Sequence, residues 1–66
     1  MFDMNDIVTI KQNGVVGTIV DISGNGKDSI YAVESNTPGH IDGGYGDEWP
    51  LFFCRENEIQ KNKYFI

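Results

Sequence analysis

Three side chains of this sequence, Cys54, His40 and Asp42, are the residue types of a thiol nucleophile, its general base and an orienting carboxylate. Their spacing does not indicate that they meet. Cys54 follows Leu51-Phe52-Phe53, and burial among apolar side chains raises the pKa of a thiol and leaves it unreactive. A chain of 66 residues also has little room for a substrate pocket. We therefore predict that the protein is not an enzyme, that Cys54 is structural and that His40 is a surface residue.

No metal site or cofactor is predicted either. His40 with Asp42 and Asp47 offers only a weak metal site, because no second His or Cys lies near them in the sequence. Residues 21–26 begin like a calcium-binding loop, with oxygen-bearing side chains at alternate positions and a glycine at the sixth. The twelfth position is Ala32, where calcium requires a bidentate Glu, so the stretch is interpreted as a hairpin turn.

The candidate binding surface is the loop of residues 36–48 together with the tryptophan that follows it. These thirteen residues contain four glycines and no hydrophobic periodicity, and such long loops in compact domains tend to be functional or disordered. Carboxylates pair with Arg or Lys, and aromatic rings make cation–π contacts with the same cations. The predicted partner-binding residues are Asp42, Tyr45, Asp47, Glu48 and Trp49. In the alternative interpretation, Trp49 closes the end of a small core and the acidic residues are solvated loop charges.

Ten acidic residues against five basic ones give a net charge of −5, which favours a basic peptide or protein as partner. Nucleic-acid binding draws its affinity from clustered Lys and Arg. The five basic residues of this chain are instead spread out, at Lys11, Lys27, Arg55, Lys61 and Lys63. Nucleic-acid binding is therefore kept only as an alternative to protein binding.

The length of the chain predicts one domain, residues 1–66, whose core supplies about 3–5 kcal/mol of net stability. Disulfides and zinc cannot add to this, since the chain has one Cys and one His, which leaves tight β packing or homo-oligomerisation. A lone thiol suits a reducing cytosol. The N-terminus is acidic and no apolar run approaches transmembrane length, so we expect a soluble cytoplasmic protein without membrane contact.

The elements that must position the loop are β-strands. Stretches rich in β-branched and aromatic residues, or with alternating apolar and polar side chains, predict five strands, at residues 7–10, 15–22, 29–35, 49–54 and 61–66. Asn13-Gly14, between the first two runs, is the strongest short hairpin signal. Gly17 inside the second strand predicts a bulge or a sharp bend. Tyr31 and Val33 share one face of the third strand and are predicted core residues.

The remaining segments are predicted to be irregular. Residues 1–5 are expected to form a loose lead-in, and residues 23–28 a polar hairpin loop. Pro50 cannot donate a backbone hydrogen bond, so it is expected at the start of the fourth strand or on a sheet edge. Residues 55–60 are predicted to form a short helical or 3₁₀ turn before the last strand.

Three of these strands resemble a known fold. Ile7-Val8-Thr9-Ile10, Gly17-Thr18-Ile19-Val20-Asp21-Ile22 and Tyr31-Ala32-Val33-Glu34-Ser35, in that order, are similar to the opening of SH3-like barrels of the KOW and Tudor kind. Those barrels often carry a G-T-V-V second strand and a Y-x-V third strand, and the match covers the first half of the chain. The resemblance implies an all-β fold, a small five-stranded SH3-like barrel, mostly antiparallel, with a short 3₁₀ turn before the last strand.

The resemblance also bears on function. In peptide-binding SH3 domains an acidic loop and a tryptophan contact the ligand, although their A-L-Y-D-Y segment is missing here. We therefore predict a small non-catalytic module that binds a basic peptide or protein surface through residues 36–49. One alternative is a KOW-like module that contacts nucleic acid, and another is an acidic inhibitor of a nucleic-acid-binding protein, of the phage or mobile-element type. A third is a self-associating subunit, which an exposed Phe52 or Phe65 would support.

Overall fold

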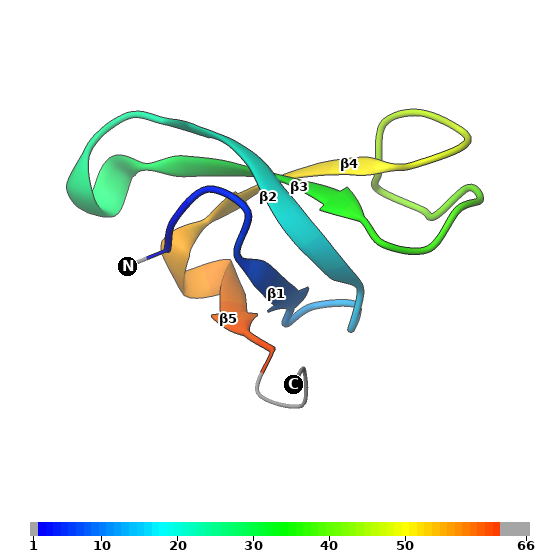
Figure 1. Cartoon of the computed structure of the whole chain (residues 1–66), viewed down its shortest axis with the longest axis horizontal. Coiled ribbons are helices and arrows are strands. Elements are labelled where there is room, and N and C mark those ends of the chain that lie inside the picture. The colour runs from blue at the N-terminus through cyan, green and yellow to red at the C-terminus, as the bar shows by residue number, and fades with distance from the viewer. Residues whose placement is uncertain (1, 63–66) are drawn as a thin grey trace.

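The computed structural model describes residues 2–62, which form a single five-stranded antiparallel sheet (Figure 1). The strands are β1 (Ile7–Ile10), β2 (Val16–Ser23), β3 (Ile30–Ser35), β4 (Leu51–Arg55) and β5 (Ile59–Lys61). Two 3₁₀ turns, η1 (Gly26–Asp28) and η2 (Glu56–Glu58), lie before β3 and before β5. The predicted all-β fold class, the antiparallel pairing and the 3₁₀ turn before the last strand are therefore confirmed. Neither helical turn in the described chain has the length and apolar character needed to cross a bilayer.

The strand order is β4-β3-β2-β1-β5, so the long strand β2 lies at the centre. The Asn13-Gly14 turn joins it to β1 as predicted. The N–H of Gly14 donates to the carbonyl of Ile10 over 2.8 Å, and the Asn13 side chain accepts from the N–H of Val15 over 3.0 Å. These bonds close the hairpin and fix the register in which Val8 lies opposite Gly17.

Gly17 does not mark the bulge that the sequence predicted at this position. The register of β2 against β3 shifts between Ile19 and Asp21, further along the strand. Gly17 is needed for a different reason, because a Cβ atom there would lie 2.6 Å from both the carbonyl oxygen of Glu34 and the Cγ1 of Val33. The glycine allows β3 to approach closely, which is the other common role of glycine within a strand.

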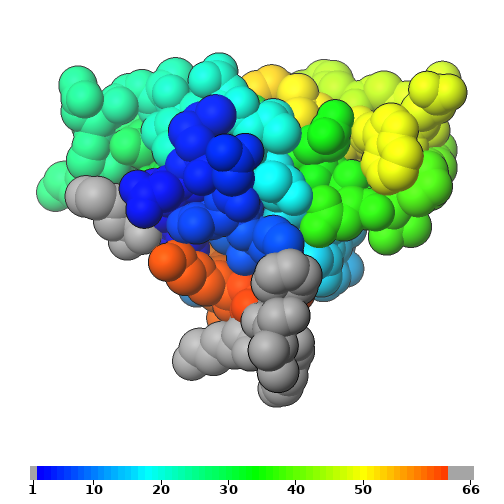
Figure 2. Space-filling model, viewed as in Figure 1, coloured from blue at the N-terminus to red at the C-terminus, as the bar shows by residue number. Residues whose placement is uncertain are grey.

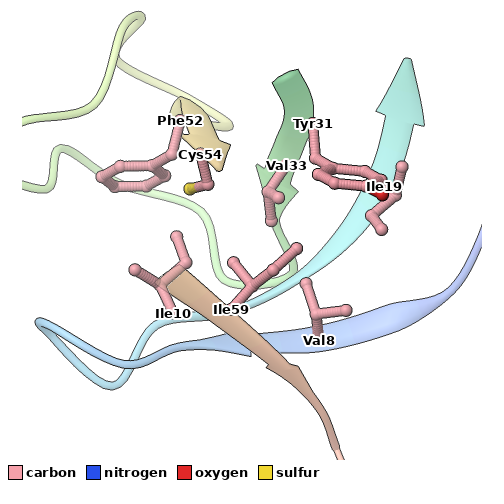
Figure 3. Packing of buried hydrophobic residues seen from close by; sticks show 8 residues of the cluster. All are labelled: Val8, Ile10, Ile19, Tyr31, Val33, Phe52, Cys54 and Ile59. Atoms are coloured by element: carbon pink, nitrogen blue, oxygen red, sulfur yellow. The ribbon is translucent and has the colours of Figure 1, made fainter. Parts of the chain in front are cut away.

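The core lies between the two halves of the bent sheet (Figure 3). Val8, Ile10 and Ile59 point from β1 and β5 toward the side chains of β3 and β4. The buried cluster is Val8, Ile10, Ile19, Tyr31, Val33, Phe52, Cys54 and Ile59. Tyr31 and Val33 belong to it, which confirms the predicted core pair. Burial of these side chains on one face is the main stabilising contribution to the fold.

Residues 2–5 are not the loose lead-in that was expected. The ring of Phe2 packs edge-on against Tyr31, with 5.5 Å between the ring centroids. The N–H of Asn5 donates to the carbonyl of Ile19 over 2.8 Å, and the N–H of Ile19 donates to the carbonyl of Asp6 over 2.9 Å. This segment therefore covers the core beside the irregular part of β2, where the ladder with β1 has ended.

The end of the described chain also differs in detail from the prediction. β5 begins at Ile59 rather than at Lys61, because Ile59 is a core residue that pairs with Ile10. Pro50 directly precedes β4, as expected, and its carbonyl accepts from the N–H of Ser35 over 2.9 Å. The predicted strand residues 63–66 lie outside the described residues.

The sheet is not closed into a complete barrel. Within residues 2–62, β4 and β5 form its two edges and share no backbone ladder, although η2 connects them in sequence. The five strands and the bent sheet are compatible with a small β-barrel-like fold. An open edge on β4 is the consequence that matters for the candidate site.

Candidate functional site

The predicted binding loop, residues 36–48, connects β3 to β4 and projects from the sheet at the end opposite η1 (Figure 1). It contains no regular strand, but it is held by backbone hydrogen bonds. Tyr45 and Leu51 form an isolated antiparallel bridge, in which each N–H donates to the other residue's carbonyl over 2.9 and 2.8 Å. The N–H of Gly39 also donates to the carbonyl of Glu48 over 2.7 Å. The loop is therefore a structured extension of the β4 edge.

Gly44 positions this loop against the core. A Cβ atom at residue 44 would lie 2.8 Å from the Cβ of Pro50 and 2.9 Å from the Cζ of Phe52. Both neighbours are buried, so the loop can lie this close only because residue 44 has no side chain. The contact places Tyr45, the next residue, opposite Leu51.

Three large side chains near this loop are exposed. Tyr45, Phe53 and Trp49 are 68%, 57% and 49% accessible, and the Tyr45 and Phe53 rings meet edge-on with 5.8 Å between their centroids. Trp49 is not part of the buried cluster, so it does not close the end of the core. The loop and the start of β4 form one end of the molecule, at the right of Figure 2.

Phe53 is an exposed residue of the candidate site that the sequence interpretation did not name. Adjacent residues of a strand point to opposite faces, so only one of Phe52 and Phe53 can face the core. Phe52 is buried, so it is not the exposed ring that would support a self-associating subunit. Phe65, the other ring named for that alternative, lies outside the described residues. The Phe-Phe pair was the available signal, but the sequence did not indicate which ring faces outward.

A cavity of about 750 Å³ lies between the loop, β4, the β1–β2 turn and η2. Its walls include two of the predicted residues, Asp42 and Tyr45, together with Phe53 and Glu58. Asp47, Glu48 and Trp49 do not line it, although all three are exposed. The structure therefore brings two of the five predicted residues into one concave site and leaves the other three on the outer surface of the same segment.

The charged groups around the cavity are mixed but mainly acidic. Asp42 and Glu58 supply carboxylates and Lys11 supplies the one cation among its lining residues. Lys61 pairs with Asp6 over 3.8 Å, while Lys27 and Arg55 border a separate hollow of about 450 Å³. Lys63 lies outside the described residues. The described basic residues are thus distributed over several surfaces.

His40 lies between two acidic residues of the loop. Its Nε2 is 3.4 Å from Asp42 Oδ1 and its Nδ1 is 4.0 Å from Asp47 Oδ1, and all three side chains are well exposed. The two ring nitrogens thus approach two separate carboxylates. Among residues 2–62, no group of three His, Cys, Asp or Glu side chains is arranged to hold a metal ion.

Cys54 is buried, as its apolar neighbours predicted. Burial raises the pKa of its thiol, and the nearby negative charge of Glu58 raises this pKa further. A thiol in this environment stays protonated at neutral pH, and the thiolate is the reactive form. Cys54 therefore contributes to the wall of the cavity as an apolar group.

The arrangement is suited to binding an extended or cationic group. It combines a cavity, exposed rings, carboxylates and a sheet edge. No protein-family model, curated protein or solved structure matches this chain. What the site binds is accordingly inferred from its own residues.

Proposed function

We propose that this protein is a small non-catalytic interaction module that binds a basic peptide or a basic protein surface through residues 36–49. The observation that carries the proposal is the exposure of Tyr45, Trp49 and Phe53 at one end of the molecule. The other described rings, Phe2, Tyr31 and Phe52, contribute to the core or pack against it. Aromatic side chains are enriched in binding sites because they supply a large contact area with few rotatable bonds.

The charge of the same surface supports a cationic partner. Asp42 and Asp47 are almost fully exposed, and His40 is the only basic side chain paired with them in the described chain. A cation over an exposed ring contributes about 0.5–1 kcal/mol, and an exposed ion pair about 0–1 kcal/mol. Because each contact is small, we expect several to act together and the dissociation constant to be on the order of micromolar or weaker.

We further propose that the fold is an SH3-like barrel of the KOW or Tudor kind and that the protein is cytoplasmic. The strand order β4-β3-β2-β1-β5 and the 3₁₀ turn between β4 and β5 support the first of these proposals. The single buried thiol at Cys54 supports the second, because reduced cysteines are usual in the cytosol.

Binding of basic peptides to Tyr45→Ala and Trp49→Ala variants tests the function. We expect each variant to bind at least about threefold more weakly than the wild type in calorimetry, since each loses about 0.7 kcal/mol or more of ring contact. Met4→Ala is the matched control, because Met4 is also 49% accessible and the N-terminal segment lies away from the loop in Figure 1. Unfolding of Trp49→Ala together with unchanged binding by Tyr45→Ala would contradict the proposal. Salt-sensitive RNA binding that depends on Lys11 would replace it with the nucleic-acid alternative.

A further inference from the structure

The free edge of β4 carries an unused pair of backbone groups. The N–H of Ser35 donates to the carbonyl of Pro50. In an antiparallel ladder every second residue pair exchanges backbone hydrogen bonds, so the pairs of β3 and β4 alternate between bonded and non-bonded from this point on. Phe52 and Cys54 consequently direct their backbone groups toward β3. Leu51, Phe53 and Arg55 direct theirs away from β3, toward the free edge.

Two of these three positions on the free edge already have partners. Leu51 exchanges two hydrogen bonds with Tyr45, and the N–H of Arg55 donates to the Glu58 carboxylate over 2.6 Å. Phe53 lies between them, and no residue within 2–62 pairs with its N–H or its carbonyl. The edge therefore has one open position between two occupied ones.

The cavity lies against the same part of the edge. Phe52, Phe53 and Cys54 form one of its walls, and the loop at Asp42 and η2 at Glu58 contribute the others. Its volume of about 750 Å³ is within the range of ligand pockets. With a rise of about 3.3 Å per residue, the part of β4 between the occupied positions Leu51 and Arg55 accommodates about three residues of an extended chain. We call this cavity and the open position at Phe53 the β4-edge groove.

We propose that the partner of this module is an extended peptide of alternating apolar and basic residues that adds a strand to β4 in the β4-edge groove. This inference rests on the proposed function and specifies how the partner binds. The peptide residue opposite Phe53 exchanges both hydrogen bonds with it and continues the antiparallel pairing that Tyr45 begins at Leu51.

The alternation of side chains along a strand determines which peptide residues face the protein. The residue opposite Phe53 points to the same face as the Phe53 and Tyr45 rings, where a Lys or Arg makes cation–π contact. Its two neighbours point to the face of Phe52 and Cys54, where apolar side chains fit. Asp42 and Glu58, which line the groove, add attraction for basic residues.

Charge also favours a peptide over a second copy of this chain. Each copy carries a net charge of −5, and pairing of two β4 edges would bring their acidic loops together. A basic peptide instead neutralises this charge. We therefore expect the protein to remain monomeric in analytical ultracentrifugation at the concentrations used for binding. Dimers joined through the β4 edge would overturn the assignment of a peptide partner.

The test compares two short peptides of alternating valine and lysine, one unmodified and one methylated on the backbone nitrogen of the central lysine. Methylation removes one N–H donor while keeping every side chain, so we expect affinity for the full-length protein to fall by about 3- to 10-fold, the equivalent of one hydrogen bond. In nitrogen-15 NMR spectra, the Phe53 amide should shift on binding and exchange with solvent at least about tenfold more slowly. A third peptide, with the same residues in two blocks rather than alternating, should bind more weakly than the alternating one.

The outcomes separate this inference from the proposed function. If all three peptides bind equally and the Phe53 amide does not change, strand addition is wrong, while the basic-peptide function stands. If none of the peptides binds, the proposed function fails and the inference fails with it. Tighter binding of the unmodified alternating peptide, together with protection of the Phe53 amide, supports both.

Discussion

Replacement of Gly44 by alanine tests whether the loop must lie against the core to form the site. The added Cβ would be 2.8 Å from Pro50 Cβ and 2.9 Å from Phe52 Cζ, closer than ordinary van der Waals contact. Because both neighbours are buried, the loop rather than the core should move outward by several tenths of an ångström. This movement separates Tyr45 from Leu51 and weakens the bridge between them.

The expected cost follows from these contacts. Overpacking of this kind destabilises a protein by about 1–3 kcal/mol, a large share of the roughly 3–5 kcal/mol available to so small a domain. With a urea dependence of about 1 kcal/mol per M, the unfolding midpoint should fall by about 1–3 M. Circular dichroism is the suitable probe, since Trp49 is half exposed and reports poorly on core packing.

Gly14→Ala is the matched control for this experiment. Nothing lies within 4 Å of the Cβ that it adds, but its φ of +74° is unfavourable for alanine, at a cost of about 1–2 kcal/mol. Both variants should therefore be less stable than the wild type. Only Gly44→Ala should accelerate amide exchange at Tyr45 and Leu51, and it should also weaken peptide binding. Unchanged exchange at Tyr45 in a folded Gly44→Ala variant would refute the role assigned to Gly44.

Two further predictions concern the core. Gly17→Ala places a Cβ 2.6 Å from the Glu34 carbonyl oxygen in the paired strand, so we expect the urea midpoint to fall by about 2 M or more, and a fall no larger than that of Gly14→Ala would contradict this. For Cys54, whose pKa is raised by burial and by Glu58, alkylation by iodoacetamide should reach half its maximal rate at a higher pH than for free cysteine. Because the folded protein holds this proton more tightly than the unfolded chain, the thiol's contribution to stability is complete below the ordinary thiol pKa. It is lost as pH rises through the folded-state pKa, and Glu58→Gln should move the alkylation profile back toward lower pH.

Much of the fold was predictable because its signals are local. Alternating apolar residues identified strands close to their observed bounds, and β1 begins and ends at the predicted residues. Asn13-Gly14 identified the first hairpin, and the polar residues 23–28 identified the second. These features depend on backbone geometry within a few residues, which the residue types themselves favour.

The errors concern features set by partners distant in sequence. The bulge lies between Ile19 and Asp21 rather than at Gly17, because the register depends on how β3 packs across β2. β5 begins at Ile59 because that side chain is paired with Ile10 and buried. The N-terminal residues are ordered by the carbonyl of Ile19 and the ring of Tyr31. No local pattern at these positions indicates those contacts.

The sequence by itself determined the β-rich fold class, the acidic charge and the loop of residues 36–48 as the place to look for a binding site. These follow from composition, side-chain periodicity and the distribution of glycine. Only the tertiary structure decided that Phe53 faces outward, that Trp49 is exposed and that Asp42 and Glu58 line the same cavity. The reason is that exposure and cavities depend on which face of each strand is covered, and long-range strand pairing decides which face that is.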